Sequence, residues 1–410
     1  MLLSYYSLSC SLILSDDFAK KVWGSFSLKG ERMYYIITSS KGDYLSKFVK
    51  QLQNKANICL ITDRQLIEKN IKIGKHDKFY IPSDMVYGVI RDHFDPCWQG
   101  IIEKCRDKYL FRQNLRNLYP DFIFNKTTLD EIDKCSFDFT KRKRYIIKPT
   151  IGFMAGGARI ISKSSNLDKV KEEIRCELDN FARLYPDIFS SDILIEECIE
   201  GGEEFAVDMY YDNDGLPKIV NIYGHPFSAR PEYLQLLYYA SKELFNKYYD
   251  SFYKFFDDFN SDRSITSFPI HAEFMLNESG EFVPIEFNAG RFGGMGVADL
   301  TYYAFKIQPI LSYFQGKFPD RVSIWKGQEQ DLFCWVLAYN AADYSLDEYR
   351  PNHALFKKML PENAMLLEYV ELDYKKMPAF AIAYLKLKNA VDIKKILSIE
   401  FNDCFEKKDN

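Results

Sequence analysis

The sequence predicts a protein with both α/β and α+β parts, in which a parallel-sheet domain precedes antiparallel sheet with helices and a small α+β appendage. Its 410 residues, 47% of them apolar and 27% charged, exceed the needs of one small core and favour two or three packed units. Short strand-like and helical segments alternate from 33 to 105, which is typical of a βαβ unit. Strand-like segments joined by turn sequences then dominate 193–287, which indicates antiparallel sheet.

Residues 1–32 precede the first expected element, and two interpretations of them stay open. Lys29-Gly-Glu-Arg32 has possible codons that spell a purine-rich bacterial ribosome-binding site just ahead of Met33, which would make Met33 the true start. The alternative is a real but loosely attached N-terminal arm. Under either interpretation we expect these residues to carry no chemistry.

The first domain, 33–105, holds the expected βαβ unit. Its elements are a strand at Tyr34–Ile37, a helix at Tyr44–Gln53 and a strand at Asn57–Thr62. Such a unit offers a loop and a helix N-terminus to an anion, but the glycine fingerprint of a dinucleotide site is missing. A Rossmann cofactor site is therefore not expected.

The second unit, 106–200, joins a connecting helix to a glycine-rich hairpin. Apolar residues at three- and four-residue steps predict the helix from Cys105 to about Pro120. Glycines then separate two strand-like runs, which we interpret as a hairpin with a lid loop. In order, the expected elements are strand Arg144–Pro149, a loop with Gly152, Gly156 and Gly157, strand Ala158–Ile161, helix 166–184 and strand Ile193–Glu197.

The third unit, 201–325, is expected to be antiparallel sheet with one long helix, and the last, 326–410, an α+β appendage. Asn213-Asp-Gly215 is a hairpin signal between two strands. The third unit's elements are a turn at Gly201-Gly202, strands Glu204–Tyr210 and Lys218–Tyr223, a helix at 232–259, and strands His271–Leu276 and Phe282–Phe287. The appendage's elements are strands Leu332–Ala338, Ala364–Leu372 and Ala379–Leu387 and a helix at 391–397.

Charge and cysteine usage exclude several function classes. The 54 Lys and Arg residues against 58 Asp and Glu give a net charge of −4, so no large basic field favours nucleic acid or anionic lipid. No uncharged apolar run reaches the ~18 residues of a membrane span, and Met1–Leu14 lacks the charges and cleavage site of a signal peptide. Nine scattered cysteines without a C-x-x-C pair are typical of reduced thiols in a cytoplasmic protein.

Two acidic residues and an amide on adjacent strands predict a metal site. Glu286 and Asn288 face the same side of their strand, and a hairpin partner can bring Glu273 against them. An all-oxygen cluster of this kind suits Mg²⁺, which is usually held by one or two carboxylates together with nucleotide phosphates. The alternative is a pair of solvated glutamates on an exposed face, but the apolar neighbours Ile285 and Phe287 weaken it.

These motifs together resemble a known family. Ile285-Glu-Phe-Asn288, then Arg291 and Gly293-Gly294, preceded by His271-Ala-Glu273 and by Ile147-Lys-Pro149 with its glycine loop, is similar to the ATP-grasp superfamily of ATP-dependent carboxylate ligases. The resemblance covers roughly 33–318. It implies an ATP-grasp fold with a pre-ATP-grasp domain, a two-part ATP-binding core with a lid, and a C-terminal appendage.

The resemblance also assigns phosphate-binding residues. It matches Lys148 to the lysine that binds the α- and β-phosphates, and Lys108 to an earlier phosphate-binding lysine. The loop Thr150–Gly157, with Gly156 and Gly157, resembles a mobile lid over the phosphates. Phe153 and Met154 are bulkier than the lid residues of many relatives.

Further roles follow from the same resemblance. It implies that Glu196 accepts from the adenine amine, that backbone groups of Glu197 and Ile199 complete base recognition, and that Glu204 is the ribose-binding acid. Arg291 matches the arginine that faces the γ-phosphate, and together with Lys148 and Asn288 it forms the expected catalytic set. The sequence leaves the roles of His225, Arg230 and His271 open.

The resemblance implies that ATP with Mg²⁺, or Mn²⁺, phosphorylates a carboxylate, which an amine then attacks to form an amide with release of ADP and phosphate. The glycine-rich segment after Asn288 resembles the amino-acid and peptide ligase branch more than the biotin-dependent carboxylases. The expected partners are small-molecule carboxylate and amine substrates, amino acids or a peptide, and a homodimer is compatible with the sequence. Two alternatives stay open: another acceptor, as in a kinase or a thioester-forming ligase, and a non-catalytic ATP-binding protein.

Overall fold

The computed structural model describes residues 33–408 except 43, 56, 84–85, 153–155, 185–189, 229–232, 234 and 319. Residues 1–32 and the expectations about them lie outside the described residues. The N-terminal domain is the expected parallel sheet, in the order β2-β1-β3. Its strands and helices are β1 (Tyr34–Thr38), α2 (Lys47–Leu52), β2 (Ile58–Thr62), α3 (Asp63–Glu68), β3 (Lys78–Tyr80), α4 (Tyr87–Ile90) and α5 (Pro96–Arg106).

The connecting helix predicted from Cys105 to about Pro120 is present but shorter, because the chain breaks at Asp107 and the helix ends at Asn114. Helix α5 ends at Arg106, and a second helix, α6, runs over Lys108–Asn114. Asp107 has an extended backbone, with φ −77° and ψ 108°, and its carboxylate accepts hydrogen bonds from the first N–H groups of α6. The break puts Lys108 at the start of α6, where its backbone N–H donates to the carbonyl of Thr150 at 2.7 Å.

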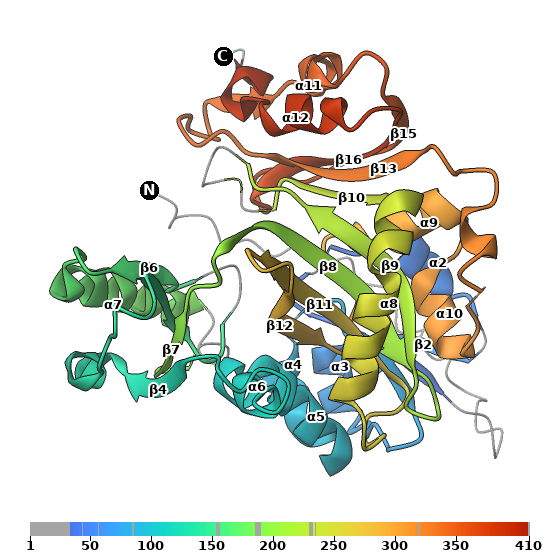
Figure 1. Ribbon diagram of the computed structural model, residues 1–410. Coiled ribbons are helices and arrows are strands. Elements are labelled where there is room, and N and C mark those ends of the chain that lie inside the picture. Colours follow the sequence, from blue (N-terminus) through green and yellow to red (C-terminus); the bar gives the residue numbers. More distant parts are fainter. Residues whose placement is uncertain are drawn as a thin grey trace.

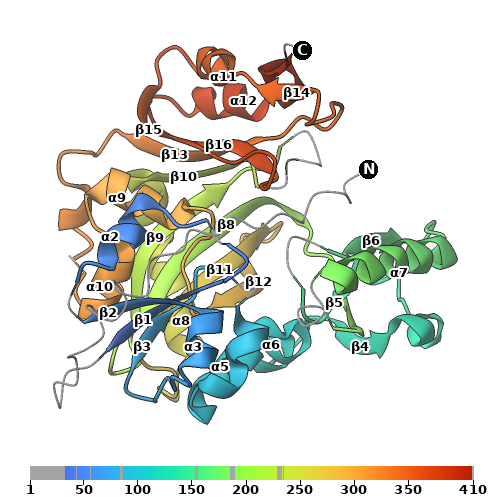
Figure 2. The same ribbon diagram turned by 180° about the vertical axis from the view of Figure 1, so that it is seen from behind.

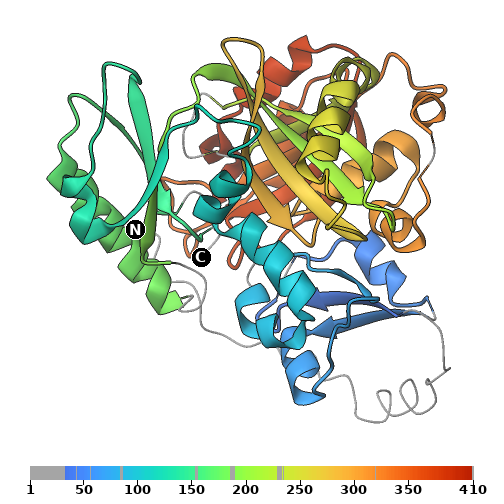
Figure 3. The same cartoon turned by 60° about the horizontal axis from the view of Figure 1, so that its bottom comes forward.

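The glycine-rich hairpin belongs to a separate lobe, which we call the lid lobe (residues 124–197). Four antiparallel strands in the order β4-β7-β5-β6 form its sheet, and one helix covers it. Buried isoleucines from the strands and the helix make its core. Figures 2 and 3 show the lobe standing out from the rest of the molecule. Its elements are β4 (Phe124–Thr128), β5 (Arg144–Pro149), β6 (Arg159–Ser162), α7 (Leu167–Leu184) and β7 (Asp192–Glu197).

An eight-stranded antiparallel sheet forms the centre of the molecule, in the order β12-β11-β8-β9-β10-β13-β16-β15 (Figure 1). Gly201-Gly202, expected to be a turn, instead begins β8; a Cβ at Gly201 would lie 2.2 Å from the Leu276 carbonyl oxygen, so only glycine fits there. The strands are β8 (Gly201–Tyr211), β9 (Pro217–His225), β10 (Leu237–Ser241), β11 (Phe268–Asn277), β12 (Phe282–Ala289), β13 (Leu332–Tyr339), β15 (Met365–Glu371) and β16 (Ala379–Leu387).

The helix predicted over 232–259 is correct only from Lys242 onward. Residues Leu237–Ser241 form β10, and α8 (Lys242–Phe259) begins after it, capped by the Ser241 hydroxyl. Leu237, which suggests a helical face here, instead begins a strand that pairs with β13 over five residues. Tertiary pairing therefore overrides the local periodicity.

The expected C-terminal appendage is continuous with the central sheet, since β13, β16 and β15 extend it beyond β10. Two helices cover its outer face and enclose a second core with the sheet (Figure 1). Helices beside the sheet complete the structure. The remaining elements are α9 (Leu300–Phe305), α10 (Pro309–Gln315), β14 (Tyr349–Pro351), α11 (His353–Met359), α12 (Val391–Leu397) and β17 (Phe405–Lys407).

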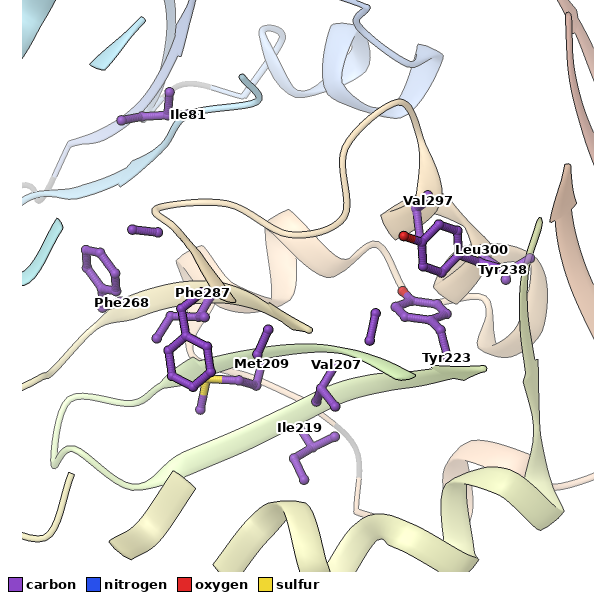
Figure 4. Packing of buried hydrophobic residues seen from close by; sticks show 14 of the residues in the cluster. Ile81, Val207, Met209, Ile219, Tyr223, Tyr238, Phe268, Phe287, Val297 and Leu300 are labelled. Atoms are coloured by element: carbon purple, nitrogen blue, oxygen red, sulfur yellow. The ribbon is translucent and has the colours of Figure 1, made fainter. Parts of the chain in front are cut away.

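The main core joins the N-terminal domain to the central sheet. Figure 4 shows side chains of β8, β11 and β12 packed together, with Ile81 of the N-terminal domain nearby. The rings of Phe79 and Phe268 meet edge to face with centroids 5.8 Å apart. The core thus fixes the N-terminal domain against the sheet. In the described part of the chain, every helix is too short or too polar to cross a bilayer.

Candidate functional site

The strand register brings the predicted metal residues together. Glu273 lies directly opposite Glu286 across β11 and β12, and His271 lies opposite Asn288. Alternation along the strands places all four side chains on one face of the sheet. The amide of Asn288 is 3.4 Å from an oxygen of Glu273 and 3.4 Å from an oxygen of Glu286.

The electrostatics of this face favour a bound cation. Burial raises the pKa of Glu273 well above its usual range, and the nearby carboxylates of Glu286 and Glu204 raise it further, while Arg291 and Lys108 oppose them. Among the described residues, no group of three His, Cys, Asp or Glu side chains forms a complete metal cage. The two carboxylates suit Mg²⁺ that also takes phosphate oxygens as ligands, whereas Asn288 turns its amide nitrogen to them and its oxygen to Arg291.

Two cations flank the acidic pair, and both were predicted. The ammonium of Lys108 lies 3.3 Å from a Glu286 oxygen and donates to the carbonyl of Gly152 at 2.9 Å. The guanidinium of Arg291 donates to the side-chain oxygen of Asn288 at 2.7 Å. Lys108 consequently links the base of the lid loop to Glu286.

Asp208, a buried residue of β8 that sequence reasoning missed, holds the loop that follows β12. Its carboxylate accepts from the backbone N–H of Gly293 at 2.8 Å and from the Tyr223 hydroxyl at 2.8 Å. It also lies 2.7 Å from Nδ1 of His271, whose other ring nitrogen is 3.6 Å from Glu273. A charged residue in the middle of the apolar run of β8 was the available signal.

Half-buried Glu204 and buried His225 form a pair on the same face. A carboxylate oxygen of Glu204 lies 2.7 Å from Nδ1 of His225, and the Tyr238 ring stacks on the imidazole with centroids 4.2 Å apart. In the described part of the chain, the second ring nitrogen of His225 has no hydrogen-bond partner. Arg230 lies outside the described residues.

Lys148 lies in a buried ion-pair cluster with Glu196 and Arg112, which we call the ion triad. The Lys148 ammonium is 2.6 Å from Oε1 of Glu196, and Arg112 donates to both oxygens of that carboxylate, at 2.5 and 3.2 Å. Burial lowers the pKa of Lys148. Burial alone would raise the pKa of Glu196, but the two cations outweigh it and lower that pKa to about 2.

Arg112 was not predicted, and the sequence carries no local sign of it. Its partners lie 84 and 172 positions away, at Glu196 and at the carbonyl of Pro284, to which it donates at 2.5 Å. Spacing within α6 marks it only as a neighbour of buried Phe111. We expected the Glu196 side chain to contact adenine, but both of its carboxylate oxygens already bind Arg112, and one of them also binds Lys148.

The hinge residues follow Glu196 in the chain, and the lid glycines follow Lys148. Glu197 accepts from Arg142 at 2.6 Å, and its backbone N–H donates to the carbonyl of Ile123, while Ile199 is half-buried beyond the end of β7. Gly156 and Gly157 are buried, and Gly157 has a φ of +72°, which favours glycine. The lid residues Phe153 and Met154 lie outside the described residues.

Comparison with known proteins identifies the domain that carries this site. Residues 142–299 match the ATP-grasp domain family. The chain contains an ATP-grasp domain. Apart from Lys108, all the predicted site residues fall within the matched segment. No curated protein matches the chain.

Solved structures with little sequence identity share the whole fold. An L-amino acid ligase from Bacillus licheniformis superposes with a TM-score of 0.63 at 14% identity, covering 92% of this chain and 98% of that one. N5-carboxyaminoimidazole ribonucleotide synthetase from Thermotoga maritima gives 0.58 at 12%, covering 92% and 99%. Biotin carboxylase from Campylobacter jejuni gives 0.57 at 12%, covering 89% and 84%. These likenesses confirm the predicted ATP-grasp fold class.

Proposed function

We propose that this protein is an ATP-dependent ligase that joins a carboxylate to an amine through an acyl phosphate and releases ADP and phosphate. One observation carries the proposal: in an ATP-grasp domain, the opposed Glu273 and Glu286 share one face with Asn288, beside the cations Lys108 and Arg291. This set of oxygens and fixed cations matches the needs of phosphoryl transfer, which are positioning and charge neutralisation.

Each residue of the set has a distinct role in the proposal. Glu273, Glu286 and Asn288 would hold Mg²⁺ or Mn²⁺, which neutralises phosphate charge when bound. Lys108 and Lys148 bind the phosphates as point charges. Arg291 faces the transferred phosphoryl group and stabilises the charge that develops on it.

The nucleotide base and the lid are assigned by the same logic. Backbone groups at Glu197 and Ile199 border the base, and Glu204 binds the ribose while His225 holds its carboxylate. The lid loop with Gly156 and Gly157 closes over the phosphates and keeps water from the acyl phosphate.

An amino acid or a short peptide is the proposed substrate class. The segment from Asn288 to Gly294 resembles amino-acid and peptide ligases, and a protein named as an L-amino acid ligase has the same fold over nearly the whole chain. The loop that Asp208 anchors through Gly293 is then the substrate-side turn. A cytoplasmic location and a homodimer stay predictions.

Phosphate release measured together with product mass tests the proposal. The protein is incubated with Mg·ATP and pooled amino acids, with Glu286→Ala as the inactive variant. Glu281→Ala, an exposed glutamate in the turn of the same hairpin, is the matched control. We expect ADP, phosphate and a condensed amide mass from the wild type and the control only.

Other outcomes would assign another chemistry. ADP with a phosphorylated product and no free phosphate would identify a kinase-type acceptor. ATP binding without turnover on any carboxylate and amine pool would contradict the ligase and favour the non-catalytic alternative.

A further inference from the structure

The ion triad holds more positive than negative charges, and this excess decides whether Lys148 can attract an anionic ligand. Lys148 and Arg112 contribute two positive charges and Glu196 one negative charge, so the net charge is 2 − 1 = +1. All three side chains are buried; Arg112 and Glu196 are each 3% exposed and Lys148 is 7% exposed. Water therefore screens these charges little.

Both oxygens of Glu196 are engaged, chiefly by Arg112. The guanidinium of Arg112 donates to Oε2 through Nε and to Oε1 through Nη2, which is the two-point geometry in which arginine neutralises a carboxylate best. Lys148 shares Oε1 only. If Arg112 were absent, Lys148 and Glu196 would form a closed neutral pair.

We infer that Arg112 is a positioning residue, which neutralises Glu196 so that the charge of Lys148 stays available to the phosphates of the nucleotide. The inference rests on the proposed function, in which Lys148 binds those phosphates. It replaces the expected adenine contact of the Glu196 side chain with a role in holding Lys148.

Arg112 also connects two parts of the site in space. Its third donor, Nη1, bonds to the carbonyl of Pro284, two residues before the metal carboxylate Glu286 on β12. Its guanidinium lies 4.4 Å from the centroid of the Phe122 ring, which restricts its motion. One side chain of α6 thus ties β7 of the lid lobe to the metal strand.

Calorimetric titration of ATP, ADP and adenosine separates this role from a merely structural one. We expect Arg112→Met to lose about tenfold or more in affinity for ATP and ADP, as for a lost charged contact, while adenosine binding is unchanged because adenosine has no phosphates. Arg116→Met is the matched control: Arg116 is an exposed arginine just after α6, and this variant should bind all three ligands as the wild type does.

The double variant Arg112→Met/Glu196→Gln provides the decisive rescue. It removes one charge of each sign, so the remaining Lys148 restores the net charge of +1, and ATP affinity should return to within about threefold of the wild type. No rescue, or an equal loss of adenosine affinity in Arg112→Met, would overturn the inference and assign Arg112 to structure alone.

Two further results keep the inference falsifiable. If Arg112→Met fails to fold, the single variant Glu196→Gln tests the inference instead. It frees Lys148 from its carboxylate partner, so ATP affinity should stay the same or rise. Weaker binding of both ATP and adenosine would overturn the inference and support an adenine contact by the Glu196 side chain. If the wild type binds neither ATP nor ADP, the proposed function fails. If the wild type binds them and Arg112→Met binds them with the same affinity, only the inference fails.

Discussion

Removal of the Asp208 carboxylate should loosen the loop that begins at Arg291. Asp208 is fully buried and accepts three hydrogen bonds. The Tyr223 hydroxyl would keep a partner, since Thr301 lies 3.1 Å from it, but Gly293 N–H and Nδ1 of His271 would both lose their acceptor. A buried donor without an acceptor costs ~1–3 kcal/mol, so Asp208→Ala should lower the free energy of unfolding by roughly 2–6 kcal/mol.

Urea denaturation measures this loss, and the ligase assay measures its effect on function. Asp208→Asn keeps one carbonyl oxygen for the two orphaned donors, so its loss should be less than half that of Asp208→Ala. Asp214→Ala, an exposed aspartate in the β8–β9 turn, is the control. Turnover should fall with Asp208→Ala because the loop also carries Arg291. A change in unfolding free energy below about 1 kcal/mol would refute the reasoning.

Two more predictions concern pH and the lid. Burial raises the pKa of Asp299 from 3.8 to about 7, so the folded protein holds this proton more tightly than the unfolded chain, and stability should fall as pH rises through that range. The stability advantage of Asp299→Asn over the wild type should therefore be larger at about pH 8 than at about pH 5. An advantage of the same size at both pH values would contradict the raised pKa. Gly157→Ala, with a φ of +72° and a new Cβ 3.1 Å from Pro149, should destabilise the lid lobe by about 1–2 kcal/mol and raise the KM for ATP. Gly202→Ala is its control, because a Cβ at Gly202 has no atom within 4 Å. Equal melting temperatures for the two variants would refute the predicted backbone strain at Gly157.

Local patterns predicted the parts of the fold that depend on neighbouring residues. Alternation and a turn sequence were enough to place Glu273 against Glu286, because a hairpin fixes its own register. The strands of the C-terminal region were also located closely. Their place in the central sheet was not, because it depends on β10, whose pairing with β13 spans about a hundred residues of chain.

The side chains that sequence reasoning missed share a physical cause. Arg112 and Asp208 make their decisive bonds to residues far away in the chain, and only Asp208 interrupts its local pattern, as a charge in an apolar strand. Charge partners, unlike strand partners, have no period in the sequence.

The arrangement of charge on the central sheet explains why this site depends on several distant segments. Adjacent strands present Glu204, Asp208, Glu273 and Glu286 on one face, which would repel one another if they stood alone. The compensating charges come from outside the strands: Lys108 from α6 and Arg291 from the loop after β12. Even with them the pKa of Glu273 stays raised, because burial and the neighbouring carboxylates favour its protonated form, and a divalent cation could take the place of that proton. The ion triad carries the opposite sign, and a nucleotide bound between the two regions would connect the lid lobe to the sheet.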